Sequence, residues 1–350
     1  MRNSSCSSGQ PKPAPAIIAP TGSSFLDVSG ISIETERGVV LHNISFKQQE
    51  FQNIAIAGET GSGKSTLLKV IAGLAQPDTG HVFFEGELVE GPAEKLVPGH
   101  AGIAYLSQHF ELPKSLRVEQ VLKYANTLDA DEAETLHEVC RISHLLKRRT
   151  DQLSGGEKQR VAVARLLSTS PKLFLLDEPF SNLDPVHKNI LKSVIQDIGE
   201  KLQITCIMVS HDPLDSLPWA DAILVIKDGS LLQQGAPEQI YRQPVNEYAA
   251  ALFGKYNLIS TALAAKLTGA PVKAAEGKQA LIRPESLKIA AATKIKPNAG
   301  RVQKVSFHGS YYQIEIMFPE GTLMVTAGRS EVKAGDMLSV LLSPDEVWYV

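Results

Sequence analysis

The chain has 350 residues, of which 43% are hydrophobic and 21% are charged, and its formal net charge at pH 7 is −3. This weak negative charge gives no sign of a nucleic-acid partner or of binding to an anionic membrane surface. No apolar stretch approaches the ~20 residues of a membrane-spanning helix. The length suggests two domains. Three cysteines without metal-ligand spacing favour a reducing compartment.

The N-terminal segment is rich in Ser and Pro. It lacks the continuous apolar centre of a signal peptide. We therefore expect residues 1–24 to form a disordered tail.

The segment 58–66 matches the P-loop pattern G-x-x-x-x-G-K-[ST]. Its glycines allow the backbone to point several N–H groups at one anion, just before a helix N-terminus. Lys64 is predicted to reach the β- and γ-phosphates of a nucleotide, and the Ser65 hydroxyl to bind Mg²⁺. The predicted ATP-binding residues are Gly58, Glu59, Thr60, Gly61, Ser62, Gly63, Lys64, Ser65 and Thr66.

Four short apolar runs each lead into polar residues that could serve a phosphate group. Continuous apolar runs are typical of parallel strands buried on both faces, and such sheets bind ligands outside the carboxyl ends of their strands. We therefore expect an α/β domain in which all four ends meet. The runs are residues 54–57 before the P-loop, 102–107 before Gln108, 173–176 before Asp177, and 204–210 before His211.

Chemistry suggests a role for each strand end. Asp177 is predicted to hold Mg²⁺, and Glu178 to activate the attacking water as a general base. Gln108 could orient that water or contact the metal. His211 could donate a hydrogen bond to the γ-phosphate. Alone, Glu178 could be a surface acid and His211 a core histidine, but their shared position after apolar strands favours catalysis.

Two further regions have distinct patterns. Apolar residues at helical spacing predict a helical subdomain over about residues 109–152. Phe110 and Leu112, just past Gln108, could contact a membrane partner or pack as a loop. The C-terminal region has short alternating segments separated by Gly, which predict a small barrel. These segments include residues 302–307, 312–318, 337–342 and 347–350.

The order of the motifs resembles that of the ATP-binding cassette (ABC) ATPases over about residues 25–255. The distinguishing motif is Leu153-Ser154-Gly155-Gly156, which precedes a basic helix and the strand ending in Asp177-Glu178. The resemblance implies that Ser154, Gly155, Gly156 and Glu157 contact ATP held by a second subunit, and that Asp184 runs along the subunit interface. Two identical chains would then enclose two molecules of Mg-ATP.

The C-terminal region resembles the regulatory domain of importer ATPases, on the motif Arg283-Pro284-Glu285 and the β pattern that follows. The whole resemblance implies a P-loop NTPase ABC domain over 25–255 with a helical subdomain, and an all-β OB-like domain over 275–350. That domain would regulate transport or act as a scaffold for the dimer. Importers of this kind serve sugars, polyamines, iron or sulfate, and the linker 252–258 is most similar to polyamine and iron importers.

The resemblance also implies partners and a location. The chain would be the ATP-hydrolysing motor of an importer, peripheral on the cytoplasmic face of the membrane. It would bind transmembrane permease subunits near Gln108 and the helical subdomain, and work with an extracytoplasmic substrate-binding protein. We expect no nucleic-acid partner.

The sequence departs from the family pattern in two places. The stretch 33–37, where relatives usually have an aromatic residue that stacks on adenine, has no aromatic residue, so Ile33 or Arg37 would cover the base. Glu157 replaces the usual Gln of the signature motif. Other readings are a soluble ABC ATPase of translation or DNA maintenance, and an exporter ATPase. The first usually has paired cassettes or a basic surface, and the second usually lacks an appended β domain.

Overall fold

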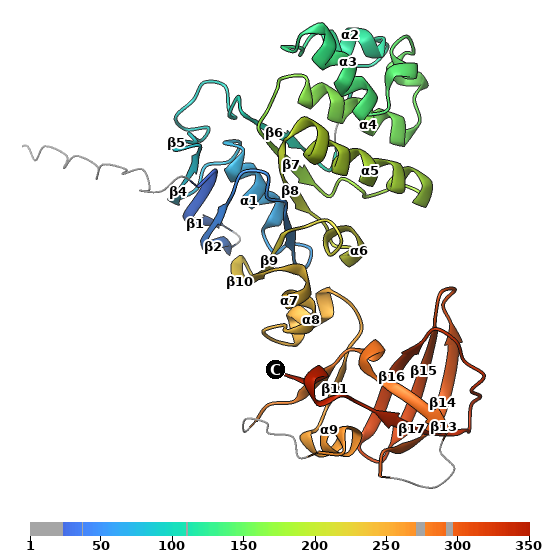
Figure 1. Cartoon of the computed structure of the whole chain (residues 1–350). Coiled ribbons are helices and arrows are strands. Elements are labelled where there is room, and N and C mark those ends of the chain that lie inside the picture. The colour runs from blue at the N-terminus through green and yellow to red at the C-terminus, as the bar shows by residue number, and fades with distance from the viewer. Residues whose placement is uncertain (1–23, 37, 110, 271–276, 292–296) are drawn as a thin grey trace, which may run out of the picture.

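The computed structural model describes residues 24–36, 38–109, 111–270, 277–291 and 297–350 (Figure 1). The tail predicted over 1–24 lies outside the described residues except for its last residue, and so do Arg37 and Phe110. No helix in the described part of the chain is long and apolar enough to cross a membrane.

The centre of the ATPase part is a six-stranded sheet in the order β10-β9-β3-β8-β7-β6. Its neighbouring strands are parallel except at β10, which pairs antiparallel with β9. Every residue of β3, β7 and β8 is buried, as the continuous apolar runs predict. The strands are β3 (Ile54–Ala57), β6 (Ile103–Leu106), β7 (Leu173–Asp177), β8 (Thr205–Val209), β9 (Ala222–Lys227) and β10 (Ser230–Gly235).

A second, antiparallel sheet has the order β2-β1-β4-β5. Helix α1 (Lys64–Ile71) packs with both sheets in one apolar core, through Leu67, Leu68 and Ile71. This packing fixes the start of α1 at the carboxyl end of β3. The strands of the second sheet are β1 (Leu26–Thr35), β2 (Gly38–Gln48), β4 (Thr79–Phe84) and β5 (Glu87–Leu88).

A helical region forms one end of the ATPase part (Figure 1). Its predicted apolar faces are buried, with Val118 and Leu122 on α2 and Leu136 and Val139 on α3. Leu112 packs against the same core, which agrees with the loop-packing alternative. The region contains α2 (Val118–Lys123), α3 (Ala130–Val139), 3-10 turns at Ser143–Leu145 and Thr150–Gln152, and α4 (Gly155–Leu167). Two helices beside β7 and β8 complete the ATPase part, α5 (Pro185–Leu202) and α6 (Pro213–Ser216).

The C-terminal part forms the opposite end of the molecule, beyond α7 (Pro237–Arg242) and α8 (Glu247–Leu252) (Figure 1). It has a three-stranded sheet, β11-β12-β18, and a five-stranded sheet, β13-β17-β14-β15-β16. The edge strands β13 and β16 of the larger sheet lie close together, so the sheet curls into an OB-like form. The elements are β11 (Asn257–Ile259), α9 (Thr261–Thr268), β12 (Ala280–Ile282), a 3-10 turn (Pro284–Ser286), β13 (Lys288–Ala291), β14 (Ala299–Phe307), β15 (Tyr312–Phe318), β16 (Gly321–Ala327), β17 (Met337–Leu341), a 3-10 turn (Pro344–Glu346) and β18 (Trp348–Tyr349).

The predicted α/β domain with an all-β C-terminal domain is therefore confirmed. The two domain boundaries stay predictions, although the C-terminal core includes Ile259 and Leu263, which lie before residue 275. The predicted strand over 312–318 coincides with β15, and the run 337–342 contains β17.

Arg283 joins the two parts of the chain. Its guanidinium is buried and donates hydrogen bonds to the carbonyl oxygens of Ala250, Gly254 and Lys255 at 3.1–3.2 Å. It also stacks on the ring of Tyr241, 4.0 Å from the ring centroid. The planar five-donor fork of Arg suits several carbonyl acceptors at once. The C-terminal part is thus docked on α7 and α8.

Candidate active site

The P-loop connects β3 to α1, and Gly63 is the N-cap of this helix with a φ of 95°. A Cβ atom on Gly63 would lie 2.6 Å from the carbonyl oxygen of Val40 and from the Leu41 side chain. Glycine is therefore required for α1 to begin against β2. The free N–H groups of the first helical turn suit an anion. The other predicted residues lie where expected, with Thr60, Gly61 and Ser62 in the loop and Ser65 and Thr66 in the first turn.

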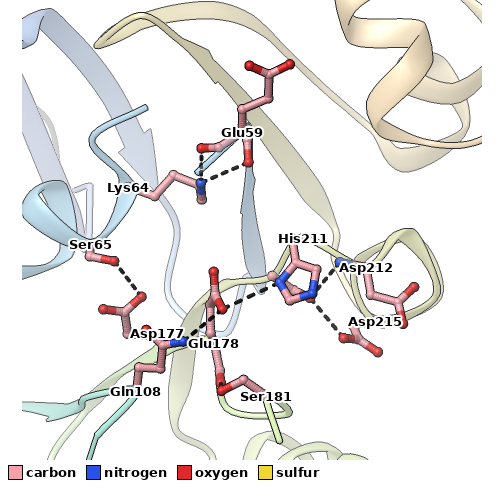
Figure 2. Close-up of polar contacts among 12 residues, drawn as sticks. Glu59, Lys64, Ser65, Gln108, Asp177, Glu178, Ser181, His211, Asp212 and Asp215 are labelled. Atoms are coloured by element: carbon pink, nitrogen blue, oxygen red, sulfur yellow. Dashed lines mark hydrogen bonds and ion pairs between the residues drawn. The ribbon is translucent and has the colours of Figure 1, made fainter. Parts of the chain in front are cut away.

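Lys64 lies buried in the loop that it closes. Its ammonium donates hydrogen bonds to the carbonyl oxygens of Gly58 at 2.8 Å and Glu59 at 2.6 Å (Figure 2). Burial lowers the pKa of Lys64, while the carboxylates of Glu178, Asp177 and Glu59 act in the opposite direction. A nearby phosphate group would favour the charged ammonium in the same way.

Asp177 ends β7 and lies beside the first turn of α1. Its Oδ1 atom accepts a hydrogen bond from the Ser65 hydroxyl at 2.9 Å, and its Oδ2 atom accepts one from the Tyr105 hydroxyl at 2.9 Å. The pairing of β6 with β7 sets Tyr105 against Leu175, two residues before Asp177. Burial and the Asp177 carboxylate raise the pKa of Tyr105. The carboxylate is therefore buried and held at both oxygens.

Glu178 follows β7 in a strained turn. Its φ of 47° is an uncommon backbone conformation for a residue with a side chain, and it costs free energy. The Glu178 N–H donates to the carbonyl oxygen of Val209 at 3.0 Å, and its own carbonyl accepts hydrogen bonds from the Ser181 N–H and hydroxyl. These bonds hold the turn in place, as expected where backbone strain serves a function.

The Glu178 carboxylate points between Gln108 and His211 (Figure 2). Gln108 Nε2 donates to Glu178 Oε2 at 3.3 Å, and His211 Nδ1 lies 3.5 Å from the same oxygen. The His211 side chain is 67% exposed, so it is open to a ligand rather than buried in the core. The structure thus brings Lys64, Ser65, Gln108, Asp177, Glu178 and His211 to one edge of the sheet.

The segment after His211 is held by lysines from α5. Lys188 Nζ lies 2.6 Å from Asp212 Oδ2 and 2.8 Å from Asp215 Oδ1, and Lys192 Nζ lies 2.8 Å from the same Asp215 oxygen. The Ser210 hydroxyl donates to Asp215 Oδ2 at 2.9 Å. Asp215 is buried, so this ionic network fixes the backbone on both sides of His211.

Four residues that support the site were not predicted from the sequence, namely Tyr105, Lys188, Asp215 and Tyr248. The Tyr248 hydroxyl accepts a hydrogen bond from the Glu59 N–H of the P-loop at 3.0 Å. Tyr248 is 189 residues from Glu59, and Tyr105 is 72 residues from Asp177. No local pattern could have shown either contact. A tyrosine inside the apolar run 102–107 was the one available signal.

The signature residues lie apart from this cluster. Ser154 is the N-cap of α4, and its Oγ accepts from the Glu157 N–H at 3.3 Å while the Glu157 carboxylate accepts from the Ser154 N–H at 2.8 Å. The backbone bond from Ser154 and the nearby Arg148 lower the pKa of Glu157. Glu157 thus closes a capping box. Within the described residues, the polar contacts of Ser154 stay in α4.

Asp184 is the N-cap of α5. Its Oδ1 atom accepts from the backbone N–H groups of Val186 at 3.0 Å and His187 at 3.2 Å.

Which residue covers the adenine remains a prediction. Ile33 is half-buried in β1 opposite Leu41.

Two family models match this chain. The model described as ABC transporter matches residues 41–181, and the model described as TOBE domain matches residues 280–350. Among solved structures, cbiO1 from Clostridium perfringens, described as part of an ABC transporter complex, is similar with a TM-score of 0.54 and 26% identity. That similarity covers 63% of this chain and 91% of the other.

Curated relatives match both parts of the chain. The glucose import ATP-binding protein GlcV of Saccharolobus solfataricus is 32% identical over 79% of this chain and 84% of its own length. The spermidine/putrescine import ATP-binding protein PotA of Clostridium acetobutylicum is 29% identical over 92% and 95%. The sulfate/thiosulfate import ATP-binding protein CysA of Gloeobacter violaceus is 32% identical over 85% of each chain.

These relatives differ in what their names say they import, but all are ATP-binding subunits of importers. Because this coverage exceeds the ATPase part, their similarity extends into the C-terminal part, which the exporter and soluble alternatives do not explain. Together with the P-loop, the strand-end carboxylates and the TOBE match, this similarity leads to one conclusion. The chain belongs to the family of ABC transporter ATP-binding proteins, and it is the ATP-hydrolysing subunit of an importer.

Proposed function

We propose that this chain binds Mg-ATP at the P-loop, and that two copies close around two nucleotides to drive a membrane permease. The observation that supports it most is the position of the Glu178 carboxylate, between Gln108 and His211 and one residue from Asp177. The N–H groups of the P-loop, the Lys64 ammonium and the start of α1 would bind the phosphates.

Ser65 and Asp177 would hold the Mg²⁺ ion. Their side-chain oxygens lie 2.9 Å apart at the start of α1, so both could face one ion beside the phosphates. Mg²⁺ usually takes one or two carboxylates together with phosphate oxygens and water, which suits a site with one buried carboxylate. Gln108 is a further candidate ligand. The ion would offset phosphate charge when bound.

Glu178 would act on the attacking water. The Gln108 amide lies on one side of its carboxylate and the His211 imidazole on the other. A general base must lie within hydrogen-bond reach of the proton that it accepts. His211 would donate to the γ-phosphate as charge develops there, and the ionic network at Asp215 would hold it in place.

The signature would complete the site of the partner subunit. The Ser154 hydroxyl accepts the Glu157 N–H, so its own hydrogen stays available to donate to a phosphate oxygen. The N–H groups at Gly155 and Gly156 belong to the first turn of α4, where an anion is favoured. Asp184 would lie at the interface between the two copies.

The transport partners follow from the family. The chain would act on the cytoplasmic face of a membrane, with permease subunits docked near Gln108 and the helical region, and with an extracytoplasmic binding protein supplying the substrate. Relatives of similar identity carry names for glucose, polyamine and sulfate import. Because the permease and binding protein select the substrate, we propose none for this chain.

Glu178→Gln tests the proposal. The amide preserves shape but cannot accept the proton of water, so we expect ATP binding to stay and turnover to fall by at least about 100-fold. Light scattering should then detect a dimer with ATP and Mg²⁺ but not with ADP. The matched control Glu134→Gln, at an exposed position of α3, should keep turnover. Wild-type turnover in Glu178→Gln would contradict the assigned base.

A further inference from the structure

We propose that His187 is a positioning residue that holds Asp184 and the signature glycine Gly156 together, so that both elements meet the partner's nucleotide as one unit. This inference rests on the proposed enclosure of ATP between two copies of the chain. His187 has no assigned role, and it lies in the first turn of α5.

The His187 ring packs directly on the signature. A Cβ atom on Gly156 would lie 2.4 Å from Cδ2 and 2.8 Å from Cγ of the ring, closer than real Cβ contacts. The ring therefore covers the backbone of the first turn of α4, at a residue expected to offer an N–H to the partner's γ-phosphate. Moving the ring would change the position of that turn.

The same ring binds Asp184. Nδ1 of His187 lies 2.5 Å from Asp184 Oδ2, while Oδ1 of that carboxylate caps α5. The hydrogen bond from the His187 side chain lowers the pKa of Asp184. The carboxylate is 56% exposed and is expected at the interface, where it would repel the partner's triphosphate. A hydrogen bond from the imidazole reduces that repulsion and fixes the direction of the carboxylate.

The next residue connects the same turn to the other half of the site. Lys188 Nζ binds Asp212, which follows His211. The first turn of α5 thus contacts the signature, expected to face the partner's nucleotide, through His187. Through Lys188 it contacts the segment that faces the chain's own nucleotide. A shift at either end would be transmitted through one rigid helical turn.

A purely structural role for His187 is the simpler alternative. In that alternative the side chain, which is 33% exposed, would stabilise each subunit and have no effect on their association. The two roles differ in one measurable quantity, the ATP concentration needed to form dimers. A positioning role changes this concentration while nucleotide binding by the monomer stays the same, and a purely structural role does not change it.

The test uses the full chain with Glu178→Gln as the parent, so that ATP is not consumed. His187→Leu keeps a side chain of similar size without hydrogen bonding, and His187→Asn keeps an N–H donor at the place of Nδ1. Dimerisation is followed by light scattering as a function of ATP. Binding of a fluorescent ATP analogue is measured at a protein concentration where the chain is monomeric, and thermal unfolding checks that each variant is folded.

We expect His187→Leu to raise the ATP concentration for half-maximal dimerisation by about 10-fold, the loss typical of a hydrogen bond to a charged group. His187→Asn should stay near the parent, and analogue binding should stay unchanged in both. Combined with Asp184→Asn, His187→Leu should add little further loss, because the two residues form one contact.

Parent-like dimerisation in His187→Leu would overturn the inference. Equal losses of dimerisation in His187→Leu and His187→Asn would do the same. So would additive losses of dimerisation when His187→Leu is combined with Asp184→Asn. If the parent binds the analogue but never dimerises, the proposed two-subunit site itself is wrong, and the inference fails with it. The parent measurement thus separates the two failures.

Discussion

The Tyr105 hydroxyl lies 2.9 Å from Oδ2 of Asp177, the carboxylate whose other oxygen accepts the Ser65 hydroxyl. Tyr105 comes from β6 and Asp177 from the neighbouring strand β7. The phenol thus helps to fix the direction of the buried carboxylate that would hold Mg²⁺ in the proposed site. Groups that orient metal ligands in this way commonly matter to metal affinity.

Tyr105→Phe should therefore weaken Mg²⁺ binding. Loss of an orienting group typically costs about 10-fold or more in metal affinity, so the Mg²⁺ concentration for half-maximal ATPase activity should rise by that factor. Activity at saturating Mg²⁺ should recover in large part. The control is Tyr124→Phe, since the Tyr124 side chain is exposed. An unchanged Mg²⁺ requirement in Tyr105→Phe would show that the contact does not support Mg²⁺ binding.

The missing aromatic residue predicts weak selection between nucleotide bases. The wild type should hydrolyse ATP and GTP with similar kcat/KM. Thr35→Tyr would place a ring in the middle of the stretch 33–37, at the end of β1. Since stacking of an aromatic side chain on a base contributes roughly 1–3 kcal/mol, KM for ATP should fall by about 10-fold. Thr35→Leu supplies bulk without a ring and serves as control. A strong preference of the wild type for ATP would mean that another group covers the adenine.

Lys188→Met should destabilise the segment around His211. It removes one ionic partner from Asp212 and one from the buried Asp215. Hydrogen bonds to charged groups contribute about 1.5–3 kcal/mol, so the free energy of unfolding at pH 7 should fall by roughly 2 kcal/mol, and kcat should fall with it. Lys201→Met, on the same helix, removes an exposed pair with Asp197 and should cost less than about 1 kcal/mol.

The effect of Lys188→Met should depend on pH. Burial raises the pKa of Asp212, but hydrogen bonds from Lys188 and Leu214 outweigh it and lower the pKa overall. A lowered pKa adds stability above the unfolded value, about 3.9 for Asp, and that stability is lost as the pH falls through the folded pKa. The difference between wild type and Lys188→Met should therefore shrink below about pH 4. Urea unfolding across pH would measure it, and a constant difference would contradict the ionic origin.

Arg283→Met should loosen the C-terminal part. The substitution keeps the apolar stem but removes the donor from the carbonyl oxygens of Gly254 and Lys255, while the Ala250 carbonyl keeps the Phe253 N–H. Hydrogen bonds of a charged group contribute about 1.5–3 kcal/mol, so the C-terminal part should separate from α7 and α8 more often, and proteolysis between residues 252 and 258 should become faster. Arg283→Lys should be cleaved as fast as Arg283→Met, because an ammonium lacks the planar fork of the guanidinium. Arg301→Met, which loses one exposed bond to Gly335, is the control and should be cut at the wild-type rate.

The sequence by itself was enough to predict the features that depend on patterns of neighbouring residues. The P-loop, the apolar runs and their polar ends are patterns within a few residues, so Lys64, Asp177, Glu178 and His211 could be predicted, together with the parallel sheet. The alternation over 312–318 identified β15 for the same reason. Parallel strands must bring their carboxyl ends to one edge, so even the meeting of these residues followed from their positions.

The tertiary structure alone decided which distant side chains support that site. The register of β6 against β7 puts Tyr105 near Asp177, and the packing of α5 beside α6 joins Lys188 to Asp212. The Glu59 N–H finds its acceptor in Tyr248, on a helix that follows the whole sheet. Such contacts depend on how elements pack rather than on any pattern in the chain. The adenine cover is the opposite case, since its expected ring is missing from the sequence and the cover by Ile33 or Arg37 stays a prediction.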